Sequence, residues 1–177
     1  MPQYTNEAHN PDAMDYYEDM GSSVGRLRLI AHGDSLVGIW FEHGRDAARS
    51  NATLEQKSLP VLTRTRRQLE EYFAGQRREF ELPLEPRGTE FQRRVWQRLT
   101  QIAYGDTTTY GALADDLGNP NGSRAVGLAN GSNPIPIVIP CHRVIGADGS
   151  LTGFGGGLAI KSALLELERG ARQPRLL

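Results

Sequence analysis

The sequence predicts an α+β protein whose first half is rich in strands and whose second half is mainly helical. Residues 26–30 alternate between polar and apolar, and residues 36–41 form an apolar run of strand length, which together favour a β-hairpin. Beyond a proline-containing stretch at 82–88, apolar residues recur at helical spacing. Two short helical segments joined by a glycine-containing turn then favour a helix-turn-helix.

Composition places the chain among globular proteins with a core of ordinary size. Of 177 residues, 38% are hydrophobic and 23% are charged. No apolar run reaches the length of a membrane span, and the polar, acidic start of the chain leads us to expect no secretory signal. The single cysteine, Cys141, excludes an internal disulfide and predicts a reducing, cytoplasmic location.

Proline positions and charge predict the division of the chain. We expect a mobile extension at 1–13, an N-terminal domain at 14–86, a C-terminal domain at 87–170 and a tail at 171–177. Residues 1–86 carry ten basic and fourteen acidic side chains, net −4, whereas residues 87–177 carry ten basic and seven acidic, net +3. The second domain's charge permits a polyanionic partner without requiring one.

Helix signals follow in order along the chain. Apolar residues predict a helix over 59–73 that ends near Gly75, and a capping box of Thr89 and Gln92 predicts the start of the next one. A helix at 110–117 has Thr109 as its expected N-cap. A further helix at 123–130 contains Gly127, which costs about 1 kcal/mol relative to alanine. That cost indicates a close approach of the backbone, either to another helix or to a nucleic-acid groove.

Residues 133–146 carry the chemistry. Three prolines exclude a regular helix or a central strand, while isoleucines between them require burial. We therefore expect a rigid, extended, buried segment that presents Cys141 and His142.

A lone cysteine is most often a small buried hydrophobe. His142 beside Cys141 favours a nucleophile instead, because a base must raise the thiolate fraction of a thiol. Since neighbours on an extended chain point apart, we expect a bridging water between the two, and an acidic residue that orients the imidazole. The histidines show no metal-ligand spacing with Cys141, so we expect no metal site. Glycines at 153–157 predict a loop whose backbone N–H groups could approach a ligand, and residues 158–168 predict a final helix.

Several of these motifs together resemble the alkylguanine-DNA alkyltransferase family, the methylated-DNA–protein-cysteine methyltransferases. The resemblance covers about residues 14–170 and is carried by Phe91–Trp96, Arg124–Gly127, Asn133-Pro134, the Pro140-Cys-His-Arg143 core and Gly156–Leu158. It implies a ribonuclease H-like first domain without a catalytic role and a winged-helix-like second domain.

The resemblance implies direct reversal of DNA damage. An alkyl group would pass, in one self-inactivating turnover, from the exocyclic oxygen of alkylated guanine to Cys141, and the substrate range could include alkylated thymine. His142 would be the base and Glu168 would orient it, while Asn133 would brace the turn before the active site. Tyr110 would donate to the flipped guanine and help to rotate the adjoining phosphate.

The resemblance also implies the ligand contacts. Carbonyls of Cys141 and Val144 would accept from the guanine amino group, in a pocket that includes Phe154, Gly155 and Gly156. Arg124 would fill the place of the extruded base. The helix would enter the minor groove of duplex DNA, which is about 6 Å wide, through the residues Tyr110, Ser123, Ala125, Gly127 and Asn130.

Two positions depart from the family pattern. Gly155 stands where some members have serine, and Phe154 stands where tyrosine is common. Three consecutive glycines at 155–157 predict a roomy pocket that accepts alkyl groups larger than methyl. No cofactor is expected. We expect a cytoplasmic, DNA-associated monomer, several copies of which could line up along DNA, with no membrane partner.

Three other functions remain open at this point. A cysteine hydrolase would share Cys141 and His142 but would turn over repeatedly. A non-enzymatic lesion sensor would keep the helix-turn-helix but lack the acceptor thiol, which is present here. A transcription factor would read specific sequences in the major groove.

Overall fold

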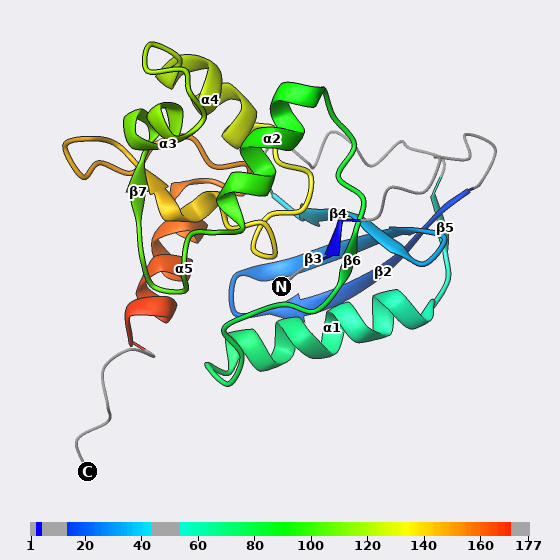
Figure 1. Cartoon of the computed structure of the whole chain (residues 1–177). Coiled ribbons are helices and arrows are strands. Elements are labelled where there is room, and N and C mark those ends of the chain that lie inside the picture. The colour runs from blue at the N-terminus through cyan, green and yellow to red at the C-terminus, as the bar shows by residue number, and fades with distance from the viewer. Residues whose placement is uncertain (1–2, 5–13, 44–53, 171–177) are drawn as a thin grey trace. The chain divides into compact units, whose positions relative to one another are not determined.

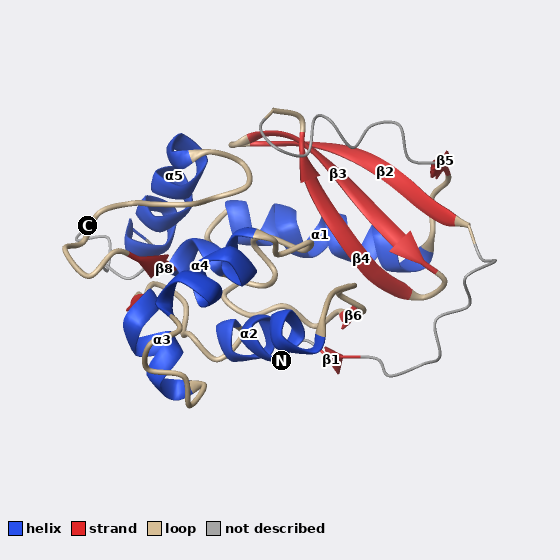
Figure 2. Cartoon of the chain, turned by 90° about the horizontal axis from the view of Figure 1, so that it is seen from above, coloured by secondary structure: helices blue, strands red, loops and turns tan. Residues whose placement is uncertain are grey.

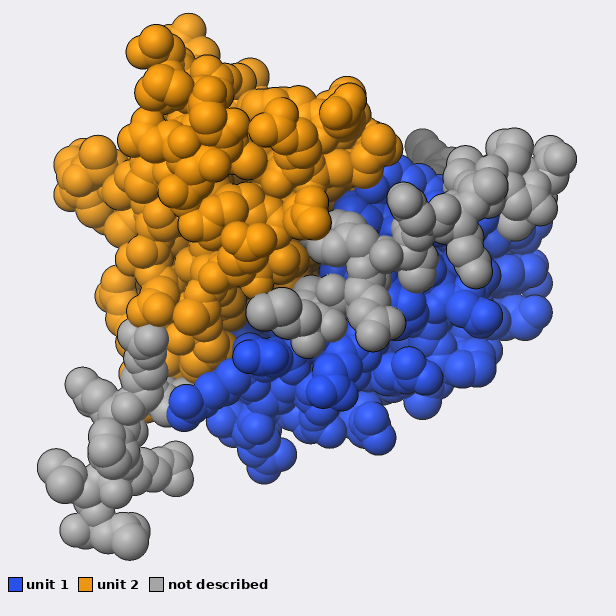
Figure 3. Space-filling model, viewed as in Figure 1, with its two compact units in different colours: residues 1–87 blue, residues 88–177 orange. Residues whose placement is uncertain are grey.

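The computed structural model describes residues 3–4, 14–43 and 54–170 and divides the chain into two compact units, Met1–Arg87 and Gly88–Leu177 (Figure 3). The boundary lies one residue beyond the predicted one. The predicted extension at 1–13 and tail at 171–177 lie outside the described residues, except for a short strand at Gln3–Tyr4.

The first unit is built around a sheet with the strand order β1-β6-β4-β3-β2-β5 (Figure 1). Its centre is an antiparallel meander of β2 (Asp15–Ser22), β3 (Gly25–His32) and β4 (Ser35–Phe41). The hairpin predicted from the alternation at 26–30 and the apolar run at 36–41 is therefore confirmed by the pairing of β3 with β4. On the outer side of β2, strand β5 (Leu54–Gln56) pairs in parallel.

Strand β2 was not predicted from the sequence. Of its eight residues only Met20 is buried, so it lacks the apolar alternation that marks a half-buried strand. Its ladder is reinforced by a cross-strand ion pair in which Arg28 Nε lies 2.8 Å from Asp19 Oδ1, and Arg28 also lies over the ring of Tyr17. Pairing on both edges, rather than apolar content, makes this segment a strand.

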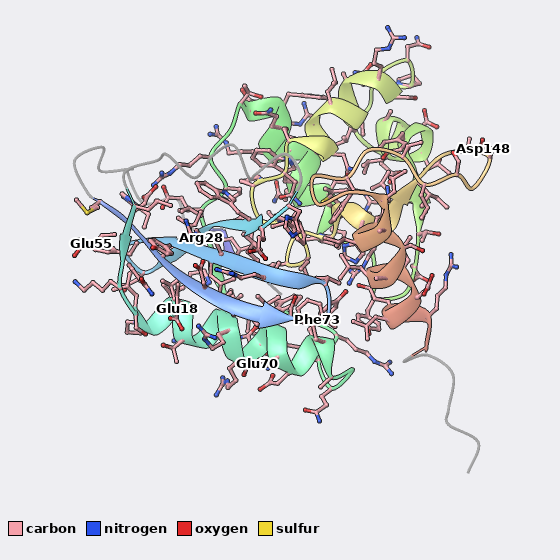
Figure 4. All side chains as sticks on the ribbon, turned by 180° about the vertical axis from the view of Figure 1, so that it is seen from behind. Glu18, Arg28, Glu55, Glu70, Phe73 and Asp148 are labelled. Carbon is pink, nitrogen blue, oxygen red and sulfur yellow. The ribbon has the colours of Figure 1, made fainter. Side chains whose placement is uncertain are left out.

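Helix α1 (Pro60–Phe73) packs against β2, β3 and β4 (Figure 2). Its buried stripe includes Leu62, Leu69 and Tyr72, which are fully buried with the apolar residues of β3 and β4. On the polar side, Glu18 of β2 lies beside α1 (Figure 4), where Arg66 Nε donates to its carboxylate at 2.7 Å. The sheet and one helix therefore share a single core.

The proline-containing stretch predicted as a linker contributes a strand. Strand β6 (Pro83–Leu84) pairs in parallel with β1 (Gln3–Tyr4) and with β4. Pro83 is the first residue of the strand, where the missing N–H is tolerated.

The second unit begins with α2 (Glu90–Leu99), whose capping box between Thr89 and Gln92 forms as predicted. The buried face of α2 packs on the helix-turn-helix, and the Trp96 indole N–H donates to the carbonyl of Ala129 at 2.8 Å. None of the helices in the described residues has the length and apolar character needed to cross a membrane.

The predicted helix-turn-helix consists of α3 (Tyr110–Asp116), capped by Thr109, and α4 (Ser123–Gly131). Strand β7 (Thr108–Thr109), just before α3, pairs in parallel with β8 (Val144–Ile145). The chain ends its described part with α5 (Leu158–Gly170).

The segment 133–146 is buried as predicted, but the expected extended conformation is wrong. It folds into a compact turn in which Ile139 N–H donates to the Ile135 carbonyl at 2.9 Å, and Cys141–Arg143 then form a short 3₁₀ helix. Ile137 adopts a φ of 74°, which a β-branched residue rarely takes. Side-chain hydrogen bonds described below close this turn, and a pattern of prolines does not reveal them.

Candidate active site

Cys141 is the first residue of the 3₁₀ helix and is 3% exposed. The turn before it is closed by Asn133, whose Oδ1 accepts from the Ile135 N–H at 3.0 Å and whose Nδ2 donates to the Ile139 carbonyl at 2.8 Å. These two bonds fix the backbone that leads into the cysteine. The sulfur is thus held by a locally rigid segment, which suits a nucleophile.

His142 and Glu168 form a fully buried pair, with His142 Nε2 2.8 Å from Glu168 Oε1. Burial lowers the pKa of His142, and the hydrogen bond with Glu168 only partly opposes this. Burial alone would raise the pKa of Glu168, but hydrogen bonds from His142 and Arg143 outweigh it and hold that pKa far below its usual range. Glu168 is therefore a carboxylate that accepts the Nε2–H of a neutral imidazole.

This arrangement selects one tautomer of His142. Because Nε2 carries the proton toward Glu168, Nδ1 is left with its lone pair. Nδ1 is buried and has no hydrogen-bond partner among the described residues. The imidazole can consequently accept a proton at Nδ1, on the nitrogen opposite the carboxylate.

Arg143 completes the anchoring of Glu168 and was not singled out by sequence reasoning. Its Nε and one terminal nitrogen donate to the two carboxylate oxygens at 2.9 and 2.8 Å, and the other terminal nitrogen donates to the Ile102 carbonyl at 2.6 Å. The Gly105 N–H also donates to Glu168 at 2.9 Å. The signal was present, since Arg143 ends the Pro-Cys-His-Arg motif.

Tyr110, the first residue of α3, lies beside the loop that precedes α5. Its hydroxyl donates to the Thr152 carbonyl at 3.1 Å, and burial raises its pKa. A Cβ on Gly127 would lie 3.7 Å from the Tyr110 ring, which is an ordinary van der Waals distance, so packing on this ring does not require a glycine. The close backbone approach predicted from Gly127 is therefore not explained by the contact with α3.

Lys161 is a second site residue that sequence reasoning missed. Its side chain is fully buried on α5, and Nζ donates to the carbonyls of Val144 and Thr152, at 2.6 Å each. Burial lowers the pKa of Lys161, while the negative charge of a Cys141 thiolate favours its charged form. Its position three residues before Leu164, on the buried stripe of the helix, is the sequence feature that indicates its burial.

The predicted pocket residues lie on two segments. Val144 is fully buried in β8, whereas Phe154, Gly155 and Gly156 are half-buried in the loop before α5. Asp148 marks the outer tip of the preceding turn (Figure 4). The loop is tied to the rest of the unit through Thr152, which receives hydrogen bonds from Tyr110 and Lys161.

Helix α4 exposes one face. Arg124 and Ala125 are exposed, Ser123 and Gly127 are half-buried, and Leu128, which was not predicted to belong to the site, is 72% exposed. Asn130 differs from the prediction of a DNA-contacting residue, because it is 1% exposed and its Nδ2 donates to the Cys141 carbonyl at 3.3 Å. It lies four residues after the buried Val126 and therefore faces inward.

A metal site finds no support in the described residues, which contain no group of three histidine, cysteine, aspartate or glutamate side chains able to hold an ion. The chemistry available is that of a buried thiol, a neutral imidazole and an anchored carboxylate, next to a helix-turn-helix with an exposed cationic residue.

Comparison with known proteins identifies the fold and the family. The ribonuclease-like domain of 6-O-methylguanine DNA methyltransferase matches residues 16–86, and the DNA-binding domain of the same family matches residues 90–170. These matches confirm the predicted fold class of a ribonuclease-like α/β domain followed by a mainly helical domain.

Individual relatives match over almost the whole chain. A methylated-DNA–protein-cysteine methyltransferase of Mycobacterium tuberculosis is 47% identical over 157 residues, which cover 88% of this chain and 93% of that protein. One from Methanosarcina acetivorans is 46% identical over 154 residues, covering 86% and 97%.

A solved structure agrees with this result. The crystal structure of Mycobacterium tuberculosis OGT in complex with DNA has a TM-score of 0.82 to this chain at 46% identity, covering 88% of this chain and 94% of that one. Both halves of the chain match domains of one family in the same order, and the protein belongs to the 6-O-methylguanine DNA methyltransferase family.

Proposed function

We propose that this protein repairs DNA as a methylated-DNA–protein-cysteine methyltransferase. It transfers an alkyl group from the exocyclic oxygen of alkylated guanine in duplex DNA to Cys141. The observation that carries the proposal is the tautomer of His142, whose Nε2–H is held by Glu168 while Nδ1 is left to accept a proton. The family match supports the same reaction.

The reaction is a displacement at a saturated carbon. The thiol proton of Cys141 passes through water to His142 Nδ1, and the thiolate attacks the alkyl carbon. A carbon–sulfur bond forms as the carbon–oxygen bond breaks, and the proton ends on the guanine that leaves. The step requires neither a metal nor an organic cofactor.

The leaving base is stabilised by donors at the pocket. Tyr110 donates to the guanine ring after giving up its bond to the Thr152 carbonyl, and its raised pKa keeps it protonated for this role. The backbone N–H of Gly155 is available as a donor to the substrate oxygen. Carbonyls of Cys141 and Val144 accept from the amino group. Three successive glycines leave room for alkyl groups larger than methyl.

DNA is bound in the minor groove through α4. The exposed Arg124 enters the duplex in place of the extruded base, and the small residues Ser123, Ala125 and Gly127 allow a close approach. Extrusion costs a few kcal/mol, which the insertion of Arg124 offsets. Arg124→Ala should therefore slow transfer from duplex DNA far more than transfer from the free base, and equal losses would remove Arg124 from this role.

The product is a thioether, which has no carbonyl for water to attack, so each molecule reacts once. A cysteine hydrolase would instead release product repeatedly. The proposal places the protein in the cytoplasm as a monomer that meets chromosomal DNA, where several copies could bind side by side.

Intact-mass analysis tests the proposal directly. After incubation with a duplex that contains O6-methylguanine, the protein should gain one methyl group, and peptide mapping should place it on Cys141. Cys141→Ala should gain none and still bind DNA. An unchanged mass for the unsubstituted protein, or more than one product per molecule, would refute the proposal.

A further inference from the structure

Leu128 is the most exposed large apolar side chain among the residues that the structure describes. It is 72% exposed, whereas Leu158 and Met14 follow at 48% and 45%. It lies within α4, where Val126 and Ala129 face the core. A single exposed leucine is ordinary on a protein surface, so it is the position of Leu128, more than its exposure, that requires an explanation.

The face of α4 that carries Leu128 also carries Arg124. Residues four apart lie on the same side of a helix, so the two exposed side chains are neighbours. Helix α4 contains no acidic residue, and this face is therefore both cationic and apolar. Duplex DNA fits such a face, because it offers phosphates to the cation and the apolar edges of deoxyriboses to the leucine.

Leu128 differs in size from the other residues that the proposed groove contact uses. Ser123, Ala125 and Gly127 are small and allow the helix to come close. A leucine on the same helix enters a groove about 6 Å wide only if the groove opens. Proteins that bind the minor groove frequently insert apolar side chains and deform the duplex as they do so.

The spacing along α4 indicates which nucleotides Leu128 would meet. Four residues correspond to about 6 Å of helix, and successive base pairs are about 3.4 Å apart. With Arg124 in the place of the extruded base and α4 following the groove, Leu128 lies beside the nucleotides next to the lesion. It therefore acts on the flanking sequence, not on the alkylated base.

We propose that Leu128 is a DNA-contacting residue that packs against deoxyriboses of the minor groove beside the lesion and thereby makes transfer depend on the flanking sequence. This inference rests on the proposed function. A-tracts have a stiff and narrow minor groove, whereas TA and CA steps deform easily. A lesion flanked by TA or CA steps should therefore react faster than a lesion within an A-tract, and Leu128 carries part of that preference.

Two duplexes that differ only in their flanks provide the test. Both contain O6-methylguanine, and single-turnover transfer to Cys141 is measured at protein concentrations below saturation. The unsubstituted chain should prefer the duplex with deformable flanks. Leu128→Ala should slow transfer from that duplex by roughly three- to tenfold, the effect of a partly buried leucine side chain. It should slow transfer from the A-tract duplex less, and leave the reaction with free O6-methylguanine unchanged.

Two further variants serve as controls. Leu128→Met keeps a long apolar side chain and should retain both the rate and the preference of the unsubstituted chain. Met14→Ala removes an exposed apolar side chain from the first unit and should change neither. Thermal unfolding of Leu128→Ala should match that of the unsubstituted chain, because the side chain it shortens is largely exposed.

The remaining outcomes overturn the inference. Equal slowing with both duplexes would mean that Leu128 does not make transfer depend on the flanks, and equal slowing with the free base would show a role in the fold. If Leu128 instead contacts a second copy of this chain, Leu128→Ala would change the sedimentation of the protein alone and leave both duplex rates unchanged. Failure of the unsubstituted chain to accept a methyl group from any of these substrates would refute the proposed function itself.

Discussion

The two nitrogens of His142 have different surroundings, and the difference defines how the residue works. Nε2 faces a carboxylate that Arg143 and the Gly105 N–H keep in place, whereas Nδ1 has no hydrogen-bond partner among the residues that the structure describes. Glu168 contacts the imidazole at Nε2, so in the proposed reaction it is a positioning residue that acts through His142. In that reaction it would fix the tautomer and stabilise the imidazolium that forms during transfer.

The pH dependence of transfer should reflect the lowered pKa of His142. Its ordinary value is 6.5, and burial moves it downward, so the rate should stay constant from neutral pH to below 6.5 before it falls. Glu168→Gln removes the carboxylate that favours protonation. It should therefore shift the acid limb to still lower pH and slow transfer at least about tenfold. Single-turnover rates across pH test this, and an acid limb at or above 6.5 would contradict it.

Arg143 should matter for stability because it neutralises a fully buried carboxylate. Arg143→Met leaves Glu168 without that partner and should lower the free energy of unfolding by about 3–5 kcal/mol. Arg98→Met breaks an ion pair with Asp116 that is partly exposed on both sides, and it should cost at most about 1 kcal/mol. Urea unfolding compares the two, and similar losses would argue against a special role of the buried pair.

At the level of elements, helix caps and packing glycines set the start of the second unit. A Cβ on Gly88 would lie 2.3 Å from the buried Trp96 ring and 2.8 Å from Gln92 Oε1. The ring is fully buried and cannot move aside.

Gly88→Ala should therefore destabilise the protein by about 1–3 kcal/mol. Gly131→Ala is the control, since nothing lies within 4 Å of its added Cβ and alanine favours the helix there. Its stability should be unchanged or slightly raised. Thermal unfolding measures both, and a neutral Gly88→Ala would show that the segment before α2 shifts freely.

The helices were predictable because their signals are local. The capping box of α2 and the N-cap of α3 can be read from a few neighbouring residues. Strand β2 was not predictable from the sequence, because its stability comes from partners on both edges and its own residues are mostly polar.

Site predictions failed where a polar residue turns inward. Spacing alone indicates that Asn130 faces the core, four residues after Val126, and that Lys161 shares a stripe with Leu164. In both cases the polar residue type argued against burial, although the helical spacing indicated it. The turn before Cys141 was implied only by the family resemblance, which named Asn133 as its brace. The proline pattern predicted an extended segment instead, because it reveals neither the two hydrogen bonds of Asn133 nor the positive φ of Ile137.

At the scale of the whole molecule, buried or paired ionisable groups in both units should make the folded state less stable as the pH falls. The pKa of Asp15 is lowered, since hydrogen bonds from Arg87 and His32 outweigh its burial, and the pKa of Glu168 is lowered more strongly. A carboxylate with a depressed pKa stabilises the fold above its ordinary pKa and loses that contribution as pH falls. Burial keeps His142 neutral in the folded state, whereas unfolded chains protonate this residue as the pH falls below its ordinary pKa. Acid therefore favours the unfolded state at His142 as well.

The free energy of unfolding should thus decrease below about pH 6.5, where unfolded chains protonate His142, and decrease further below about pH 4.5, where unfolded chains protonate Glu168 and then Asp15. Urea unfolding at several pH values, followed by the fluorescence of Trp40 and Trp96, reports on both units because each contains one tryptophan. Glu168→Gln should flatten the part of the decrease that lies below about pH 4.5, because the depressed carboxylate is then absent. A stability that stays constant over this range would contradict the assignment of these pKa directions.

The near-complete enclosure of the Cys141 sulfur has a consequence for a reagent that acts only once. A reaction of the Cys141 thiol with a peroxide, a disulfide or another electrophile in solution would inactivate a molecule before it met a lesion. With only 3% of the residue accessible, such encounters are rare. The closed site therefore acts as a safeguard that preserves each unused copy until a nucleobase swings in.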